Sequence, residues 1–243
     1  MSGHSKWHNI KGKKMATDAK RGKTYTKYAR LIEIAAHEGG GDPSSNVRLR
    51  TLIDSAKTES VPNVNIDRAI QKGTGALKGD AMEEVTYEAY GPSGSAFIIE
   101  CLTDNKNRTL SNVKEILSKN AGRFAGSGSV MWMFERKGVV LAKLSDGTSG
   151  LPKELELLLI DAGADDIRES EGHIRVLSDG TKWSAVRDVL TAKGAVVESA
   201  GLEYIAKQTA PVDSDAMTKV ETLIEALEGD DDVSEVHTNA VSQ

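Results

Sequence analysis

The chain has 243 residues, with 31 lysines and arginines against 36 aspartates and glutamates and a formal net charge of −5. Its 39% hydrophobic and 28% charged residues are typical of a globular protein in water, and its length predicts two or three domains. No apolar run reaches the roughly eighteen residues of a transmembrane helix, and the first residues lack the apolar stretch of a secretory signal. We therefore expect a cytoplasmic protein with no membrane partner.

The residue types that carry catalysis or hold metals form no recognisable pattern. Cys101, the single cysteine, excludes an internal disulfide and lies in an apolar run, which favours a core position over a nucleophile. The five histidines lack the spacing of metal ligands. Gly126-Ser127-Gly128 lacks the lysine of a phosphate-binding loop and is interpreted as a flexible domain boundary. We expect no enzyme, no catalytic residue, no metal and no cofactor.

Positive charge is concentrated at the start of the chain. Residues 1–30 contain nine lysines and arginines and one aspartate, a net charge of +8. A basic segment on an acidic chain indicates a polyanionic partner. Trp7, Tyr25 and Tyr28 lie among these cations, where rings can stack on bases while the cations contact phosphates. A solvated terminus is the alternative, but the excess of cations continues into a predicted helix, which favours nucleic acid.

Three helices are predicted in the first third of the chain. Apolar residues recur at helical spacing over 24–38 and stop before three glycines. Asp42 and Pro43 predict the cap and first residue of a second helix. Asn63 is the predicted cap of a third helix, which stops at Gly73. A helix-turn-helix is one interpretation of the last two helices, but an ordinary helical bundle is favoured.

The pattern changes after residue 80. β-Branched and aromatic runs predict strands at 85–90 and 95–103, and an apolar face predicts a helix at 105–120. The glycine- and serine-rich residues 124–129 mark a boundary. The elements predicted after it are strands at 130–134 and 138–144 that turn at residues 136–138, a helix at 152–162, strands at 165–169 and 173–177, a helix at 181–193, strands at 195–199 and 202–206, a helix at 213–228 and a strand at 233–237.

The order of these elements predicts how the domains are arranged. Residues 139–199 follow the order βαββαβ of ferredoxin-like domains. The strands of 85–120 and of 202–237 lack partners nearby in sequence, so we join them into one domain that receives the other as an insertion. The sequence thus predicts a multi-domain α+β fold: a basic helical domain at 1–80, a discontinuous α+β domain at 81–128 and 201–243, and an inserted ferredoxin-like α+β domain at 129–200.

Five blocks of sequence resemble the signature of the YebC family, also called the YebC/PmpR family. They are SGHSKWHNIK at residues 2–11, PNVNIDRAI at 62–70, YEAYGP at 87–92, TDNKNRT at 103–109 and GSGSV at 126–130. The resemblance spans essentially the whole chain. It implies a helical N-terminal domain and an α+β middle domain that carries a further α+β insertion.

The resemblance also implies a role in gene expression. Members of the family are described as DNA-binding transcriptional regulators. Mitochondrial relatives are translational activators of cytochrome oxidase, and bacterial relatives have been described as ribosome-associated factors that help stalled translation. The family is not known to contain enzymes.

Three hypotheses for the function remain open, each for a monomer. In the first, a transcriptional regulator docks its basic helical domain, which has a net charge of +7, on duplex DNA. In the second, the same domain binds ribosomal or messenger RNA, and the chain acts on the ribosome. In the third, the chain is a protein-interaction module with an acidic partner.

The predicted nucleic-acid contacts are the cations of the basic segment, the aromatic residues among them and two cations of the third helix. Arg68 and Lys72 are four residues apart and share a helix face. The complete set is Lys6, Trp7, Lys11, Lys13, Lys14, Lys20, Arg21, Lys23, Tyr25, Arg68 and Lys72.

Overall fold

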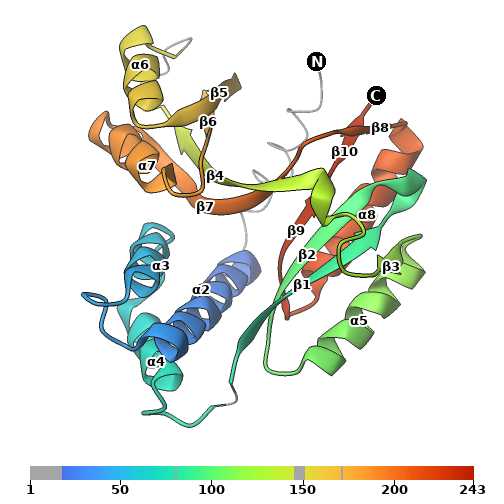
Figure 1. Ribbon diagram of the computed structural model, residues 1–243, viewed down its shortest axis with the longest axis horizontal. Helices are drawn as coiled ribbons and strands as arrows, with labels where there is room; N and C mark the ends of the chain where they lie inside the picture. The colour runs from blue at the N-terminus through green and yellow to red at the C-terminus, as the bar shows by residue number, and fades with distance from the viewer. Residues whose placement is uncertain (1–17, 80, 145–150, 171) are drawn as a thin grey trace. The chain divides into compact units, whose positions relative to one another are not determined.

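The computed structural model shows an α+β fold (Figure 1). The residues that it describes are 18–79, 81–144, 151–170 and 172–243. Their contacts divide the chain into two compact units. The first unit comprises the described residues up to 56, 61–135 and 206–243, and the second comprises 57–60 and 136–205.

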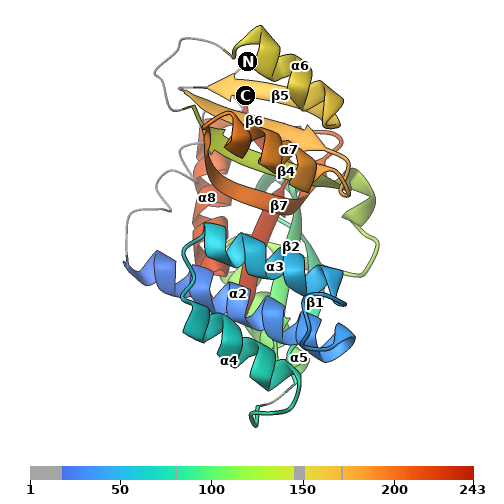
Figure 2. The ribbon, with the colours of Figure 1, turned by 90° about the vertical axis from the view of Figure 1, so that its left-hand side faces the viewer.

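Three helices form the N-terminal part of the first unit (Figure 2). They pack because each presents an apolar stripe to the others, and their buried core includes Ile32, Ala36, Leu49, Ile53, Ile66 and Ala69. Gly73 permits the close approach of the third helix to the first, since a Cβ there would lie 2.2 Å from the carbonyl oxygen of Glu33. The helices are α2 (Asp18–Gly39), α3 (Val47–Thr58) and α4 (Asn63–Gly73).

The start of α3 differs from the prediction. Pro43 is not the first helical residue, because Asp42 closes a local turn with its carboxylate and the helix begins at Val47. Asn46 caps the helix instead: its Oδ1 accepts the backbone N–H of Leu49 at 3.0 Å. The cap and the turn both use side chains that compete with the backbone for hydrogen bonds, so sequence alone does not separate them.

An antiparallel sheet with the order β3-β1-β2-β9 forms the rest of the first unit. Its last strand comes from the end of the chain, where His237 pairs with Ile98 of β2. Two helices cover one face over a core that includes Phe97, Ile99, Val113, Leu117, Leu223 and Leu227 (Figure 1). The elements are β1 (Glu83–Tyr90), β2 (Ala96–Thr103), α5 (Lys106–Lys119), β3 (Arg123–Ala125), α8 (Ser214–Gly229) and β9 (Val233–Thr238), with short 3-10 helices η1 (Pro92–Gly94) and η2 (Met131–Met133) and a small parallel pair β8 (Ala210–Val212) and β10 (Ala240–Ser242).

The second unit has the predicted βαββαβ order, which is confirmed. Its sheet has the order β5-β6-β4-β7, so the first and third strands of the motif are central. The buried core of its helices and sheet includes Val140, Leu155, Leu159, Val176, Val186 and Leu190. The elements are β4 (Phe134–Lys143), α6 (Lys153–Asp161), β5 (Ala164–Ser170), β6 (His173–Ser178), α7 (Trp183–Ala192) and β7 (Val196–Ala206).

Three local predictions in this region are wrong. The predicted strand at 130–134 is mostly the short helix η2, and residues 136–138 do not turn but continue β4. Gly138 is needed in that strand because a Cβ there would lie 2.6 Å from the Cβ of Trp183. The strands predicted at 195–199 and 202–206 are one strand, β7. Glycine therefore marks a close approach or an extended stretch here, rather than a turn.

Candidate nucleic-acid interface

The structure describes the side chains of four predicted contacts: Lys23, Tyr25, Arg68 and Lys72. Lys20 and Arg21 lie in α2, but their side chains are not among the described ones. The other predicted contacts lie outside the described residues: Lys6, Trp7, Lys11, Lys13 and Lys14. The interface is therefore built from the helices themselves.

One face of α2 carries a row of cations, Lys23, Lys27 and Arg30, at helical spacing. The ammonium of Lys23 donates to the backbone carbonyl oxygens of Glu228 and Asp230. These carbonyls lie at the C-terminal end of α8, where the helix dipole favours a positive charge. Lys23 stays a predicted nucleic-acid contact, but the structure already provides acceptors for it within the chain.

The other two members of the row also have acceptors within the chain. Lys27 Nζ lies 2.5 Å from Glu235 Oε1 on β9. Burial alone would lower the pKa of Lys27, but the Glu235 carboxylate outweighs burial and holds this pKa above its usual range. Arg30 Nη1 donates to the carbonyl oxygen of Leu102 at 2.8 Å. The row thus fastens α2 to the sheet of its own unit.

Asp232 is a further acceptor for Arg30, the last cation of the row. Its side chain is 6% exposed, and its carboxylate lies 3.3 Å from Arg30 Nη1, 2.9 Å from Arg108 Nη2 and 2.8 Å from Thr109 Oγ1. Burial raises the pKa of this carboxyl, but its bonds with Arg108 and Thr109 and the charge of Arg30 hold the pKa below its usual range. Arg108 and Thr109 belong to the block TDNKNRT, so this part of the family signature builds a buried anchor.

Tyr25 and Lys72 also make contacts within the helical part of the chain. Tyr25 is half-buried and packs against the helical core, which covers part of its ring. Lys72 Nζ lies 3.9 Å from Glu33 Oε2, and both side chains keep some exposure. Burial raises the pKa of Glu33, and the nearby Lys72 and Arg30 oppose that shift. Both residues remain predicted contacts with only part of their surface available.

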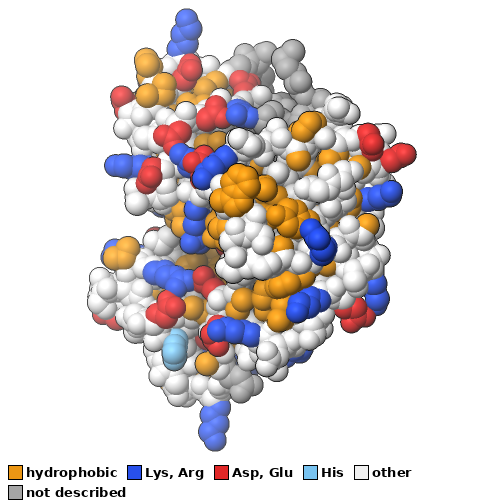
Figure 3. Space-filling view, turned by 45° about the vertical axis from the view of Figure 1, so that its right-hand side comes forward, with side chains coloured by type: hydrophobic (Ala, Val, Ile, Leu, Met, Phe, Trp, Pro, Cys, Tyr) orange, Lys and Arg blue, Asp and Glu red, His pale blue; other side chains and the backbone are white. Residues whose placement is uncertain are grey.

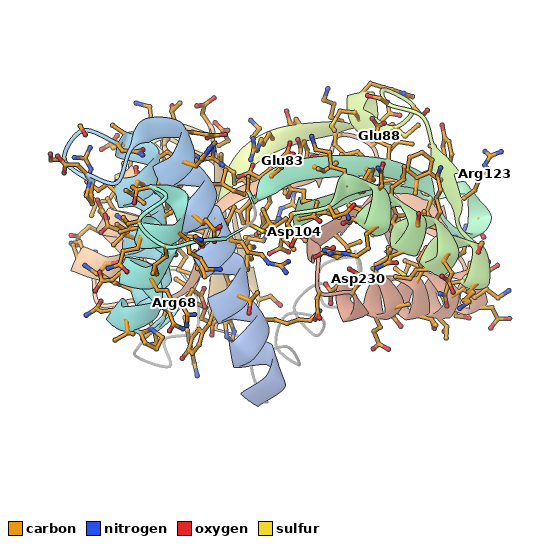
Figure 4. The ribbon with its side chains drawn as sticks, turned by 90° about the horizontal axis from the view of Figure 1, so that it is seen from below. Arg68, Glu83, Glu88, Asp104, Arg123 and Asp230 are labelled. Carbon is orange, nitrogen blue, oxygen red and sulfur yellow. The ribbon has the colours of Figure 1, made fainter. Side chains whose placement is uncertain are left out.

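The outer face of α4 presents a different environment. Asn63, Val64, Asp67, Arg68 and Gln71 are exposed, and Val64 has 75% of its surface in contact with solvent. No ion pair or hydrogen bond engages the Arg68 guanidinium among the residues that the structure describes. Figure 4 shows Arg68 on α4, and in this view α2 lies between Arg68 and the labelled Asp104 and Asp230.

A tight connection positions α4 after α3. Ser60 adopts a left-handed conformation with φ of 59°, and the buried Val61 returns its N–H to the carbonyl of Ala56 at 2.9 Å. Two helices joined by a short turn with one left-handed residue fit a helix-turn-helix and equally an αα-hairpin of a helical bundle. Pro62 is the N-cap of α4 and Asn63 its first residue, so the predicted cap at Asn63 is wrong. Proline's fixed φ suits the extended cap position.

The structure offers little for catalysis among the residues it describes. No group of His, Cys, Asp and Glu within these ranges is arranged to hold a metal ion. Burial raises the pKa of the Cys101 thiol to about 12, with nearby carboxylates adding to the shift, so the nucleophilic thiolate is disfavoured. No helix in the described part of the chain is long and apolar enough to cross a membrane.

Comparison with known proteins identifies the family. Residues 5–76 match the TACO1/YebC protein N-terminal domain, and residues 82–240 match the TACO1/YebC second and third domain. The chain belongs to the TACO1/YebC family. The resemblance that the five sequence blocks predict is thereby confirmed. The matched segments agree with a helical N-terminal part followed by α+β parts.

TACO1/YebC relatives match almost the whole chain. A probable transcriptional regulatory protein from Chlorobium phaeovibrioides is 46% identical over 98% of this chain and 95% of its own length. The probable transcriptional regulatory protein YrbC from Bacillus subtilis is also 46% identical, over 98% of this chain and 99% of its own length. The crystal structure of a conserved hypothetical protein from Aquifex aeolicus superimposes with a TM-score of 0.83 and 36% identity, covering 93% of this chain and 92% of that one.

The sequence-based set omits part of the α4 face. Asn63 and Gln71 are exposed beside Arg68 but carry no charge, and the prediction was based on cations. Gln71 lies three residues after Arg68 and shares its helix face, which is the signal that identifies it, whereas Asn63 lies five residues before Arg68 and about 140° around the helix. Arg50 of α3, also exposed, was left out because its surroundings are visible only in the structure.

Proposed function

We propose that this TACO1/YebC protein is a regulator of gene expression that binds duplex DNA through its helical domain, residues 1–80. The observation that carries the proposal is the exposed face of α4, where the Arg68 guanidinium has no partner among the described residues. The regulatory names of the relatives support the class of function. We propose that the protein acts in the cytoplasm as a monomer without a catalytic site or cofactor.

In this proposal α4 is the recognition helix. A recognition helix in the major groove places the side chains of its N-terminal residues against base edges. Arginine pairs with two acceptors of guanine, and asparagine or glutamine pairs with adenine, so Arg68, Asn63 and Gln71 suit this surface. Val64 can contact a thymine methyl group, and Asp67 can accept from cytosine while repelling nearby phosphates.

Phosphate contacts would supply most of the affinity. Arg50 is exposed in the first turn of α3, and it has no described partner. The predicted contacts of the basic segment, such as Lys11 and Lys13, would add further cations. Each phosphate neutralised releases counterions, so binding should weaken steeply as salt rises. Lys27 and Arg30 of the α2 row would position the helical domain rather than contact DNA.

The test compares Arg68→Ala with Lys219→Ala, a control at an exposed lysine of α8. Fluorescence anisotropy would measure binding to a mixed-sequence duplex and to an RNA hairpin at two salt concentrations. Arg68→Ala should weaken duplex binding by about tenfold because a bidentate base contact is lost, and Lys219→Ala should not. Equal duplex affinity of Arg68→Ala and wild type would contradict the role of α4. Tight hairpin binding without duplex binding would favour the alternative function in translation.

A further inference from the structure

Trp132 is exposed in a way that large aromatic side chains seldom are. It has 61% of its surface in contact with solvent and is the one aromatic residue among the large exposed hydrophobic residues that the structure describes. Tryptophans are usually covered because their rings bury a large apolar area. The space-filling view shows exposed hydrophobic side chains with lysine and arginine side chains at their border (Figure 3). A single exposed side chain does not by itself mark a binding site, so the surroundings of Trp132 decide its role.

The ring of Trp132 is held by its own segment. Trp132 lies in the short helix η2, and its indole N–H donates to the carbonyl oxygen of Ser129 at 3.0 Å. The polar edge of the ring is therefore already satisfied within the chain. What remains available to a partner is the apolar face of the indole.

A buried carboxylate fixes the loop before η2. Glu88 Oε1 accepts the N–H of Gly128 at 2.6 Å, and Oε2 accepts the N–H groups of Val130 at 2.6 Å and Met131 at 2.8 Å. Burial raises the pKa of Glu88, but these three bonds outweigh burial and hold the pKa below its usual range. Gly128 fits because its φ of +82° is accessible to glycine. The family blocks YEAYGP and GSGSV thus form one rigid structure, with Glu88 and Arg123 labelled in Figure 4.

Cations and a second ring adjoin Trp132. Lys207 Nζ lies 3.3 Å from the carbonyl oxygen of Trp132. The hydroxyl of Tyr90 donates to the carbonyl of Ser129 at 3.2 Å, the same oxygen that accepts the indole N–H. The guanidinium of Arg123 lies 5.3 Å from the centre of the Tyr90 ring. The Ser129 carbonyl thus links the rings of Tyr90 and Trp132. Arg123 lies against the first ring, and Lys207 is bonded to the backbone of Trp132.

We propose that these four residues, the Trp132 platform (Tyr90, Arg123, Trp132 and Lys207), bind a single-stranded segment of nucleic acid. A base would stack on the indole of Trp132, and Lys207 and Arg123 would contact its phosphates. Rings interleaved with cations are the arrangement by which proteins bind single strands without reading their sequence. Two cations outweigh Glu135, the exposed carboxylate that follows in β4. This charge is complementary to nucleic acid, whereas an apolar protein partner would not require it.

The inference rests on the proposed function in one respect, namely that the protein binds nucleic acid. It uses a different surface from α4 and a different form of the ligand. A regulator with both surfaces would hold a duplex and an adjacent unpaired strand. Each surface can be disabled without touching the other.

The experiment titrates the full chain into a labelled twelve-residue oligouridylate and follows anisotropy. Trp132→Ala should weaken binding by about tenfold, the loss expected for one stacked base. Trp132→Phe should keep most of the affinity because a ring remains. Leu157→Ala, which removes an equally exposed apolar side chain elsewhere, is the matched control and should bind as wild type does. Thermal melting of each variant would show whether it is folded.

The outcomes separate the inference from the proposed function. Equal affinity of Trp132→Ala and wild type for the oligouridylate overturns the inference, as does a wild type that does not bind it. An equal loss of duplex and single-strand binding in Trp132→Ala overturns the assignment to single strands. If Arg68→Ala leaves duplex binding unchanged while Trp132→Ala weakens oligouridylate binding, the inference stands and the role of α4 fails.

Discussion

Helices α2 and α4 pack against each other in the same core, and both carry cations at helical spacing, but the two sets have different surroundings. The three members of the α2 row, Lys23, Lys27 and Arg30, each have acceptors in the α+β part of their own unit. On α4, Arg68 faces solvent without a described partner. Each of these cations carries the same formal charge, so charge alone does not indicate which of them bind nucleic acid.

The difference follows from the hydrogen bonds that each cation forms within the chain and the hydration that it loses. A lysine or arginine bonded to a carboxylate and to helix-end carbonyls has given up part of its hydration, and replacing it leaves those acceptors unpaired. An unpaired surface cation is fully hydrated and contributes little to stability. It can still displace counterions from a phosphate backbone. The α2 row should therefore affect folding, and the α4 face should affect binding.

The largest expected effect is at Asp232, the common acceptor of Arg30 and Arg108. Asp232→Ala should reduce the free energy of unfolding by about 3 kcal/mol, because it leaves cations and Thr109 without their buried acceptor. Urea unfolding would measure the change. Asp231→Ala, in which the neighbouring exposed carboxylate is removed, is the control and should change stability by less than about 0.5 kcal/mol. Similar values for the two variants would show that Asp232 is no anchor.

The same carboxylate should make stability depend on pH. Because the pKa of Asp232 is lower in the folded than in the unfolded chain, its contribution is fully present above the unfolded value near 4. It is lost as pH falls through the depressed folded value. Asp232→Asn should flatten this acidic part of the stability curve, measured by urea unfolding between pH 2 and roughly 6. An unchanged curve would exclude this contribution.

A smaller effect is expected at Lys27, within the α2 row. Lys27→Ala should lower the free energy of unfolding by about 1 kcal/mol, since its pair with Glu235 is partly exposed and screened by solvent. Its affinity for duplex DNA should stay within about twofold of wild type if the row acts only within the fold. A tenfold loss of affinity without a loss of stability would place Lys27 in the interface and remove the distinction between the two helices.

The smallest effect on stability is expected at Arg50, which has no described partner. Arg50→Ala should change the free energy of unfolding by less than about 0.5 kcal/mol. It should reduce the slope of log affinity against log salt for duplex DNA by about one, as expected for one lost phosphate contact. Anisotropy titrations at four salt concentrations would give the slope. An unchanged slope would exclude Arg50 from the phosphate-binding surface.

Much of the architecture can be predicted from the sequence because the responsible signals are local. Helical spacing locates α5 and α8 to within one residue and the end of α2 equally well, although α2 begins at least six residues before the predicted start, and alternation of helices and strands gives the βαββαβ order of the second unit. The signature blocks identify the family. Turn residues are less informative, because Asp42 and Gly138 have more than one structural use.

What the sequence by itself determined is thus the fold class, the family, most of the elements and the basic character of the N-terminal helices. Only the tertiary structure decided which of those cations form hydrogen bonds or ion pairs within the chain. Arg30 and Asp232 are 202 residues apart, and β9 joins β2 where Ile98 pairs with His237, 139 residues later, so no local pattern relates them. Asp232 becomes an anchor only because the end of the chain returns to the first sheet and places its carboxylates and carbonyls beside α2. Arg68 stays open because the fold brings no acceptor to it among the described residues.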